Sequence, residues 1–328
     1  MTKQEILCEE FMRGVKHIKV SNRKATFKLE LHRNITILSG DSGTGKTTLY
    51  NMIADYSRLG DVSGVNLSSD SPCLVLTDGK YWLQQLQDTK DSIVFIDEGM
   101  KAIFTKEFAR AVKNSSNYYV LITREALHEL PYSVDEIYEI KTSGKMHTMK
   151  RRYPASKNLH RYTGTKSKKF DTLLTEDSNS GYQFFSHHFR DSEIQCLSAN
   201  SNSNIYKWLK EHPKENVLVI ADGAAFGAEM DRVIKECAKS KGAHQLCLPE
   251  SFEWLILKSG LIKANHLTDM LENTSDYIEC AEYFSWEKFF TAYLTEVTKD
   301  TPFSYRKSEI NQKYLIEKNR NQIANEIL

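Results

Sequence analysis

The feature that most constrains this chain is a glycine-rich stretch at residues 40–47, Gly-Asp-Ser-Gly-Thr-Gly-Lys-Thr, which fits the pattern GxxxxGK[ST]. The apolar run ITIL at 35–38 precedes it and predicts a strand, and the stretch TLYNMIADY after it predicts a helix. The glycines let backbone N–H groups turn inward around phosphate oxygens, and the helix N-terminus adds a dipole that favours an anion. The pattern therefore predicts a strand, a phosphate-binding loop and a helix in direct succession.

The same loop supplies side chains suited to a nucleotide and its metal ion. We expect Lys46 to reach the β- and γ-phosphates and the Thr47 hydroxyl to bind Mg²⁺. ATP and Mg²⁺ are therefore the expected cofactors. The residues expected to surround the nucleotide lie in the loop and at the start of the helix: Gly40, Ser42, Gly43, Thr44, Gly45, Lys46, Thr47 and Thr48.

Two later apolar runs end in polar residues that suit the same site. The run IVFI at 93–96 ends in Asp97 and Glu98. We expect Asp97 to support the Mg²⁺ ion and Glu98 to act as the general base that polarises an attacking water. The next run, YVLIT, ends at Arg124, which either contacts phosphate or is a surface residue at the strand end.

Short apolar runs alternate with helical stretches through most of the chain, which predicts parallel sheets with helices on their faces. We expect an α/β protein with a P-loop NTPase domain at 1–148 and a basic linker at 149–169. A smaller α/β domain is expected at 170–258, and a helical C-terminal segment at 259–328. The length is consistent with roughly two domains, at about 150 residues each.

Residues 25–148 resemble the nucleotide-binding core of ABC-class ATPases, in the branch shared with SMC and RecF-like proteins. The pieces that carry the resemblance are GDSGTGKTTL, IVFIDE and LITREALHELPYSVDEIYEIKTSGK. The sequence departs from that class at three points. About 50 residues separate Lys46 from Asp97, no LSGGQ-like signature is present, and Arg124 stands where the class commonly has histidine. The resemblance implies ATP hydrolysis, whereas the departures argue against the usual sandwich dimer.

Acidic residues follow two strands of the second alternation. The run LLT ends in Glu176 and Asp177, and VLVIA ends in Asp222. If these strands are parallel neighbours, Glu176 and Asp222 meet at one edge of the sheet and suit Mg²⁺ or Mn²⁺. The alternative is that both are solvent-facing acids without a catalytic role.

Residues 170–258 resemble a Toprim domain, the metal-binding fold of topoisomerases, primases and overcoming-lysogenisation-defect nucleases. Glu176 matches the glutamate after the first strand, and Asp222 matches the first acid of the DxD motif. Ala224 replaces the second acid, and Glu229 and Asp231 are nearby candidates to substitute for it. The resemblance implies that Glu176 and Asp222 are catalytic metal ligands.

A basic stretch lies between the two expected domains. From Lys141 to Phe170 the chain has ten Lys or Arg residues and no acid, although its net charge is only +1. Such a stretch can neutralise phosphates, and Tyr153 and Tyr162 within it can stack on unpaired bases. It predicts nucleic-acid binding through 145–169, with a solvated linker as the alternative. The basic residues are Lys145, Lys150, Arg151, Arg152, Lys157, Arg161, Lys166, Lys168 and Lys169.

Composition sets the remaining limits. With 40% hydrophobic and 27% charged residues, the chain is not of a fibrous or wholly disordered type. No apolar run approaches the roughly 18 residues of a membrane helix. The N-terminal residues do not follow a secretory pattern, so we expect a cytoplasmic protein without a membrane partner. Whether it forms homo-oligomers or needs a partner chain stays open.

These observations predict an ATPase whose nucleotide state controls a Toprim-like, metal-dependent module acting on nucleic acid. An ABC-class ATPase joined to a Toprim-like domain resembles overcoming-lysogenisation-defect nucleases and related antiphage systems, which implies a role in phage defence or a mobile element. The rival interpretation is an ATP-dependent switch without nuclease activity, which gates binding of a partner or of nucleic acid. A nucleoside or small-molecule kinase is a third, weaker alternative.

Overall fold

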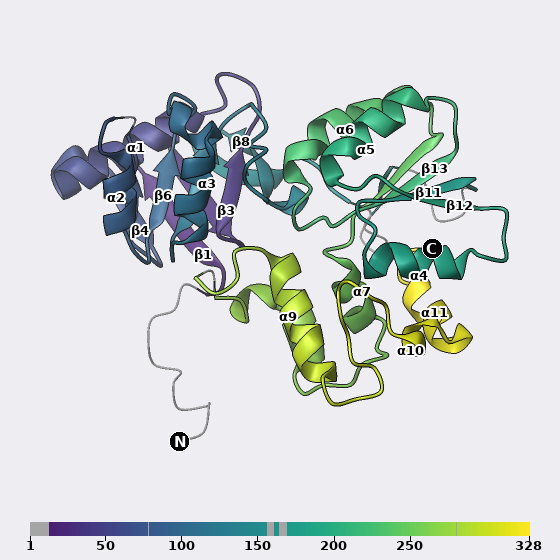
Figure 1. The fold of residues 1–328 in the computed structure, drawn as a ribbon. Helices are drawn as coiled ribbons and strands as arrows, with labels where there is room; N and C mark the ends of the chain where they lie inside the picture. Colours follow the sequence, from purple (N-terminus) through teal and green to yellow (C-terminus); the bar gives the residue numbers. More distant parts are fainter. Residues whose placement is uncertain (1–12, 78, 156–160, 164–168, 280) are drawn as a thin grey trace. The chain divides into compact units, whose positions relative to one another are not determined.

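The computed structural model describes residues 13–77, 79–155, 161–163, 169–279 and 281–328, without the side chains of 161–163. The chain is α/β and divides into two compact units, each with its own sheet (Figure 1). The first unit comprises Met1–Glu129, Glu136–Arg152 and Asn273–Phe284. The second comprises Leu130–Asp135, Tyr153–Glu272 and Ser285–Leu328.

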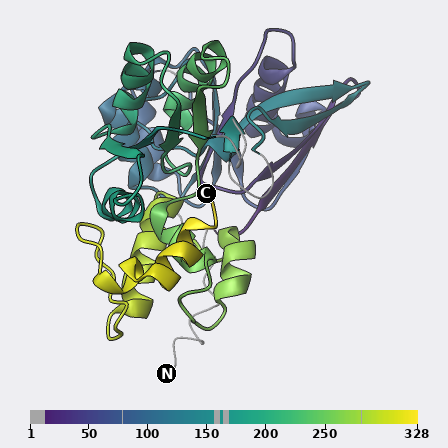
Figure 2. The same cartoon turned by 90° about the vertical axis from the view of Figure 1, so that its right-hand side faces the viewer.

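The first unit is built on a nine-stranded, mostly parallel sheet with the order β4-β1-β2-β9-β8-β3-β7-β6-β5. Strand β1 is antiparallel to β2 and β4, and β8 is antiparallel to β9, whereas the other neighbouring pairs are parallel. Figure 2 shows the antiparallel strands, in purple and teal, side by side. The strands are β1 (Lys16–Ser21), β2 (Thr26–Leu31), β3 (Ile35–Leu38), β4 (Asn66–Ser69), β5 (Cys73–Val75), β6 (Ile93–Ile96), β7 (Tyr118–Ile122), β8 (Ile137–Ser143) and β9 (Met146–Arg151).

The central parallel strands of this sheet differ from β2 in how deeply their side chains are buried. In β3, β6 and β7 every residue is buried, as expected for parallel strands covered on both faces. In β2, buried and solvent-exposed residues alternate for most of its length, so one face is turned to the core. The helices of this unit are α1 (Lys46–Leu59), α2 (Trp82–Asp88) and α3 (Lys106–Lys113), with short 3-10 turns at Gly60–Ser63, Lys101–Phe104 and Thr274–Asp276.

The second unit has a five-stranded sheet with the order β10-β14-β13-β11-β12. All neighbouring strands are parallel except β10, which is antiparallel to β14. Its strands are β10 (Arg161–Thr163), β11 (Thr172–Thr175), β12 (Gln195–Ser198), β13 (Val217–Ile220) and β14 (His244–Cys247). The buried runs TLLT, VLVI and HQLC form its centre.

Helices of the second unit follow the strands and then continue to the C-terminus. Two of them begin at serines whose hydroxyls accept from backbone N–H groups: Ser251 from Trp254, and Ser285 from Lys288. The helices are α4 (Ser180–His188), α5 (Asn202–Glu211), α6 (Gly227–Lys239), α7 (Phe252–Lys258), α8 (Leu267–Glu272), α9 (Trp286–Thr298), α10 (Gln312–Leu315) and α11 (Glu317–Ala324), and a 3-10 turn spans Val134–Glu136.

The units do not follow the expected order along the chain. The first unit continues to Arg152 rather than ending at 148, and it recruits 273–284 from the expected C-terminal segment. Two described parts of the expected linker at 149–169 have regular secondary structure: 149–151 lie in strand β9, and 161–163 form strand β10. Long-range contacts explain why 273–284 belong to the first unit: Gly14 N donates to Ser275 O at 2.8 Å, and Arg13 Nε lies 3.8 Å from Glu279 Oε2.

Within the described residues, no helix combines the length and the apolar character needed to cross a membrane.

Candidate functional site

The glycine-rich loop joins β3 to α1 and wraps around a lysine. The Lys46 Nζ atom donates to the carbonyl oxygens of Gly40 at 2.8 Å and Asp41 at 2.7 Å, and to Thr44 Oγ1 at 3.1 Å. Burial, followed by the charge of Arg124, lowers the pKa of Lys46. The loop therefore holds the Lys46 ammonium group among its own oxygen atoms, next to the N-terminus of α1.

Three glycines give the loop its shape. Gly40, Gly43 and Gly45 have φ values of 106°, 80° and 97°, in the left-handed region that other residues rarely adopt. A Cβ atom at Gly45 would also lie 3.3 Å from the Phe27 ring. That ring stacks on His147 at 4.3 Å between centroids, so the loop packs against a rigid aromatic pair.

The strand ends bring the other expected side chains to the loop. Arg124 follows β7, which lies between β3 and β6 in the sheet. Its Nη2 atom donates to Ser42 Oγ at 3.0 Å, and its Nε atom lies 3.6 Å from Glu98 Oε2. The structure thus brings the loop, Arg124 and the proposed base Glu98 together at one edge of the sheet.

The other residues expected to contact a nucleotide or its metal ion have fewer contacts with the loop. Thr47 and Thr48 are exposed on the first turn of α1. Asp97 is half-buried. Burial, followed by the charge of Asp97, raises the pKa of Tyr50 on α1. Thr123, at the end of the run YVLIT, closes a turn with the backbone of Glu125: its Oγ1 atom donates to Glu125 O at 3.2 Å and accepts from Glu125 N at 3.1 Å.

Two residues that contact the start of the loop, Glu139 and Arg152, were not predicted to do so from the sequence. The Glu139 side chain would lie 3.3 Å from a Cβ atom at Gly40, so it packs against the loop's first residue. Arg152 Nη1 donates to Ser39 Oγ at 2.7 Å, and its Nε atom lies 3.7 Å from Glu139 Oε1. Arg152 is therefore bound beside the glycine-rich loop, although its place in a basic run predicted contact with nucleic acid.

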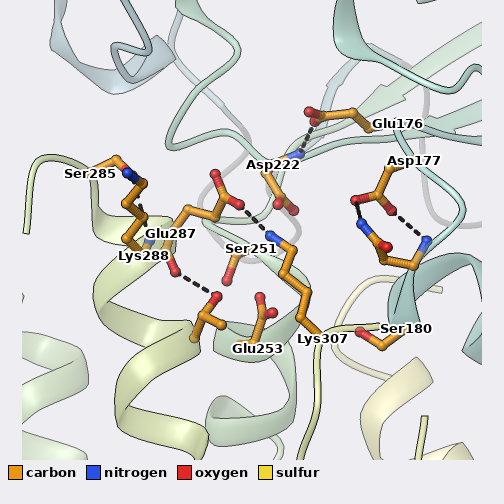
Figure 3. A network of polar contacts seen from close by, with 12 residues as sticks. Glu176, Asp177, Ser180, Asp222, Ser251, Glu253, Ser285, Glu287, Lys288 and Lys307 are labelled. Atoms are coloured by element: carbon orange, nitrogen blue, oxygen red, sulfur yellow. Dashed lines mark hydrogen bonds and ion pairs between the residues drawn. The ribbon is translucent and has the colours of Figure 1, made fainter. Parts of the chain in front are cut away.

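The second unit gathers carboxylates at one edge of its sheet. Glu176 and Asp222 follow the neighbouring parallel strands β11 and β13, and the Asp222 backbone N donates to Glu176 Oε2 at 3.2 Å. This is the neighbourhood expected from the two strand ends. Glu253, on the first turn of α7, and Glu287, on the first turn of α9, join them (Figure 3).

A lysine lies among these acids. The Lys307 ammonium donates to Glu287 Oε1 and points toward Asp222 in Figure 3. Burial works against its charge, but the carboxylates of Asp222, Glu287 and Glu253 together raise the pKa of Lys307. Neither Glu287 nor Lys307 was predicted, because both lie in the C-terminal segment without a local motif.

Crowding of negative charge changes how the acids titrate. Burial raises the pKa of Glu176 to about 7, with smaller contributions from Glu287 and Asp177. Burial also raises the pKa of Asp222, and the charges of Glu287, Glu176 and Glu253 add to the effect. Groups of this kind, beside a cavity, are typical of functional sites.

The cavity at these acids has a volume of about 40 Å³, and its lining includes Glu176, Asp222, Glu253 and Lys307. Glu253 is 1% exposed, and its Oε2 atom is buried without a hydrogen-bond partner. In the part of the chain that the structure describes, no three His, Cys, Asp or Glu residues already converge at metal-binding distances. The oxygen donors and the unpartnered Oε2 atom nevertheless fit a hard divalent cation.

The expected substitutes for the missing DxD acid are engaged elsewhere. Glu229 pairs with Arg232, and Asp231 accepts from Tyr153 at 3.0 Å and from Lys235 at 2.6 Å. Asp177 accepts from Asn179 within its own turn. Glu253 and Glu287 are the acids that supply negative charge beside Asp222 instead.

The basic stretch is only partly described. The Tyr153 hydroxyl is bound to Asp231, and Lys145 Nζ donates to Arg23 O at 3.0 Å. Lys150 and Arg151 are exposed residues of β9. Tyr162 and the basic side chains at 157, 161, 166 and 168 lie outside the described side chains.

No protein-family model matches the chain, and no curated protein sequence matches it.

Proposed function

We propose that this protein binds and hydrolyses ATP and that its nucleotide state controls a Toprim-like, metal-dependent module acting on nucleic acid. The observation that carries the ATPase half is the loop that encloses the Lys46 ammonium beside Arg124 and Glu98. The loop's own oxygens are neutral acceptors for this ammonium. A triphosphate is a stronger partner, because charge-assisted hydrogen bonds exceed neutral ones.

Each residue then has a defined task. Lys46 neutralises charge on the phosphates, and Arg124 contacts them from the end of β7. Glu98 accepts a proton from the attacking water. Mg²⁺, held by Thr47 and Asp97, supplies further positive charge when it is bound.

The ATPase half is tested by ATP binding and steady-state hydrolysis. We expect Lys46→Ala to lose ATP binding, because the loop loses its only enclosed cation among the described side chains. Glu98→Gln should bind ATP and hydrolyse it at least about 100-fold more slowly, the usual contribution of a general base. Glu107→Gln, an exposed acid on α3, is the matched control. Equal turnover in Glu98→Gln and wild type would reject Glu98 as the base.

For the second half, the supporting observation is the meeting of Glu176 and Asp222 at adjacent strand ends, with Glu253 on the same cavity. When bound there, Mg²⁺ or Mn²⁺ would polarise a phosphodiester and activate water. Glu176, Asp222 and Glu253 are the residues that we propose to hold it. A cation would also offset the burial and, after it, the neighbouring negative charges that now raise the pKa of Asp222.

Cleavage of supercoiled plasmid, single-stranded DNA and RNA tests this half. The assay contains Mg²⁺ or Mn²⁺, with and without ATP. We expect cleavage by wild type and none by Asp222→Asn, because an amide keeps the shape and loses the charge. Asp191→Asn, whose side chain is 83% exposed, is the control. Cleavage that survives in Asp222→Asn would reject this site.

A second candidate function is an ATP-dependent switch that gates binding of a partner or of nucleic acid. Ala224, buried where the second DxD acid is expected, favours it, as does the Lys307–Glu287 pair, which already supplies a cation. Metal and ATP binding without cleavage of any substrate would support the switch. The proposed setting in phage defence or a mobile element rests on the resemblance alone.

A further inference from the structure

A segment between α9 and α10 contributes Lys307 to the lining of the acidic cavity. Residues 301–310 are attached at both ends: Thr301 N donates to Thr298 O at 3.0 Å, and Ile310 N donates to Gln183 Oε1 at 2.9 Å. Tyr305 N also donates to Thr298 Oγ1 at 3.0 Å. In between, Ser180 N donates to Lys307 O at 2.9 Å. The segment is therefore fixed to the end of α9 and the start of α4.

Tyr305 in this segment is joined to Glu253 by a buried hydrogen-bond chain. The Tyr305 hydroxyl donates to Glu253 Oε1 at 2.7 Å, and it lies 2.6 Å from Ser180 Oγ. The phenol has one proton, and it donates this proton in the hydrogen bond to Glu253. In the second hydrogen bond the Ser180 hydroxyl must therefore donate to the phenol oxygen. Tyr305 is 1% exposed, Ser180 is 2% exposed and Glu253 is 1% exposed.

The chain leaves one oxygen of Glu253 without a partner. Its Oε1 atom is bound to Tyr305, whereas its Oε2 atom is buried and accepts no hydrogen bond. A buried acceptor without a hydrogen bond is destabilising, so a native structure that keeps one has a structural or functional reason for it. The adjoining cavity of about 40 Å³ exceeds the roughly 10–15 Å³ that a water-sized probe occupies. A hydrated cation is therefore a suitable partner.

The chemistry of the donor matters. An arginine at this place would fix the carboxylate but would also neutralise it. A phenol fixes the carboxylate and leaves its negative charge available to a cation. Outer hydrogen bonds of this kind orient the ligands of protein-bound metals.

We propose that Tyr305, supported by Ser180, is a positioning residue that orients Glu253 so that its second oxygen binds a divalent cation. This inference rests on the proposed function of the second unit. It adds a residue from the C-terminal segment, which no acidic motif marks. Tyr305 itself touches neither the cation nor the substrate.

The test is calorimetric titration of the full chain with Mn²⁺, which does not depend on turnover. We expect Tyr305→Phe to bind Mn²⁺ about tenfold more weakly, as for loss of an outer hydrogen bond at a metal site. Glu253→Gln should weaken binding at least as much. Adding Tyr305→Phe to Glu253→Gln should cause no further loss, because the tyrosine acts through the carboxylate.

Tyr314→Phe is the matched control. Its hydroxyl is also buried, at the next helix, but donates to the Phe303 carbonyl at 2.5 Å rather than to the site. It should lower the thermal stability in EDTA without changing Mn²⁺ affinity. If Tyr305→Phe fails to fold, Ser180→Ala takes its place, with a smaller expected loss of affinity.

Three outcomes are decisive. Unchanged Mn²⁺ affinity in Tyr305→Phe overturns the inference but not the proposed function. The inference is also overturned, and the proposed function is not, if wild type binds Mn²⁺ through Asp222 and Glu253→Gln binds Mn²⁺ with the wild-type affinity. Wild type that binds no Mn²⁺ overturns the metal site of the proposed function, and the inference with it.

Discussion

The Cβ atom that residue 45 lacks explains why glycine stands in the phosphate loop. Gly45 has φ 97°, and a Cβ atom there would meet the Phe27 ring at 3.3 Å and His147 Nδ1 at 3.5 Å. The backbone conformation and the Phe27 ring therefore both disfavour a Cβ atom at this position. The ring has little room to move away, because it is buried and stacked on His147. The loop can therefore keep its shape only if this residue has no side chain.

We expect Gly45→Ala to weaken ATP binding at least about tenfold, since the loop must move away from the rings. The left-handed conformation should also cost about 1–2 kcal/mol in unfolding free energy. Gly64→Ala is the control, because Gly64 has φ 71° with open space around it. Both variants should lose stability in urea titrations, and only Gly45→Ala should lose ATP affinity. Equal ATP affinity in the two variants would contradict the steric argument.

Helix α4 shows how packing between elements sets the acid response of the second unit. His188, near its C-terminal end, stacks on Phe184 and meets Phe189 edge-on. The preceding residue, His187, lies with its Nδ1 atom 3.2 Å from Arg320 Nη1 of α11. Burial, followed by the charges of Arg320 and His187, lowers the pKa of His188. The folded protein therefore resists a proton that the unfolded chain accepts.

This shift predicts a loss of stability in mild acid. The unfolded state binds the proton near its ordinary pKa of about 6.5, so the contribution is complete above that pH and falls as pH drops toward the folded pKa. The slope from one proton is at most about 1.4 kcal/mol per pH unit. Relative to wild type, His188→Leu, which keeps an apolar side chain, should gain urea-derived unfolding free energy as the pH falls from 6.5 to 5. Parallel curves for wild type and His188→Leu would exclude this cause.

The course of the chain through both units limits how the protein can be divided. It passes between them five times, after residues 129, 135, 152, 272 and 284. The stretch Asn273–Phe284 belongs to the first unit, where Ser275 O accepts from Gly14 N and the Phe284 carbonyl accepts from Asn34 at 3.2 Å. A fragment ending at 148 lacks these contacts, so the full chain is the proper material for functional work.

Control of one unit by the other is a coupling that can be measured directly. If the nucleotide state governs the second unit, ATP with Mg²⁺ must change amide hydrogen exchange in α7 and residues 301–310, besides protecting 40–59. Lys46→Ala should abolish both effects. Asp222→Asn should keep the protection of 40–59. Protection confined to the first unit in wild type would contradict control by ATP and leave two independent activities.

Local sequence patterns were sufficient to predict much of the fold and part of each candidate site. The strand–loop–helix at 35–59, the alternation in both units and the Glu176–Asp222 pair were all predicted, because each depends on neighbours in sequence or on the parallel order of strands. Burial of the runs ITIL, IVFI and VLVI follows from their composition, with no distant contact needed.

Contacts between distant segments supplied what the patterns lacked. Arg152 reaches Ser39 across 113 positions, and Tyr305 reaches Ser180 across 125. A basic run and a helical C-terminal segment carry no local sign of such partners, since lysine, tyrosine and glutamate are ordinary residues of solvated helices and loops. Residue types and strand order thus predict the two sheet edges at which we propose phosphate and metal binding. Which side chains complete each edge depends on long-range packing, because burial beside other charges is what turns Glu253 and Lys307 from surface residues into parts of a site.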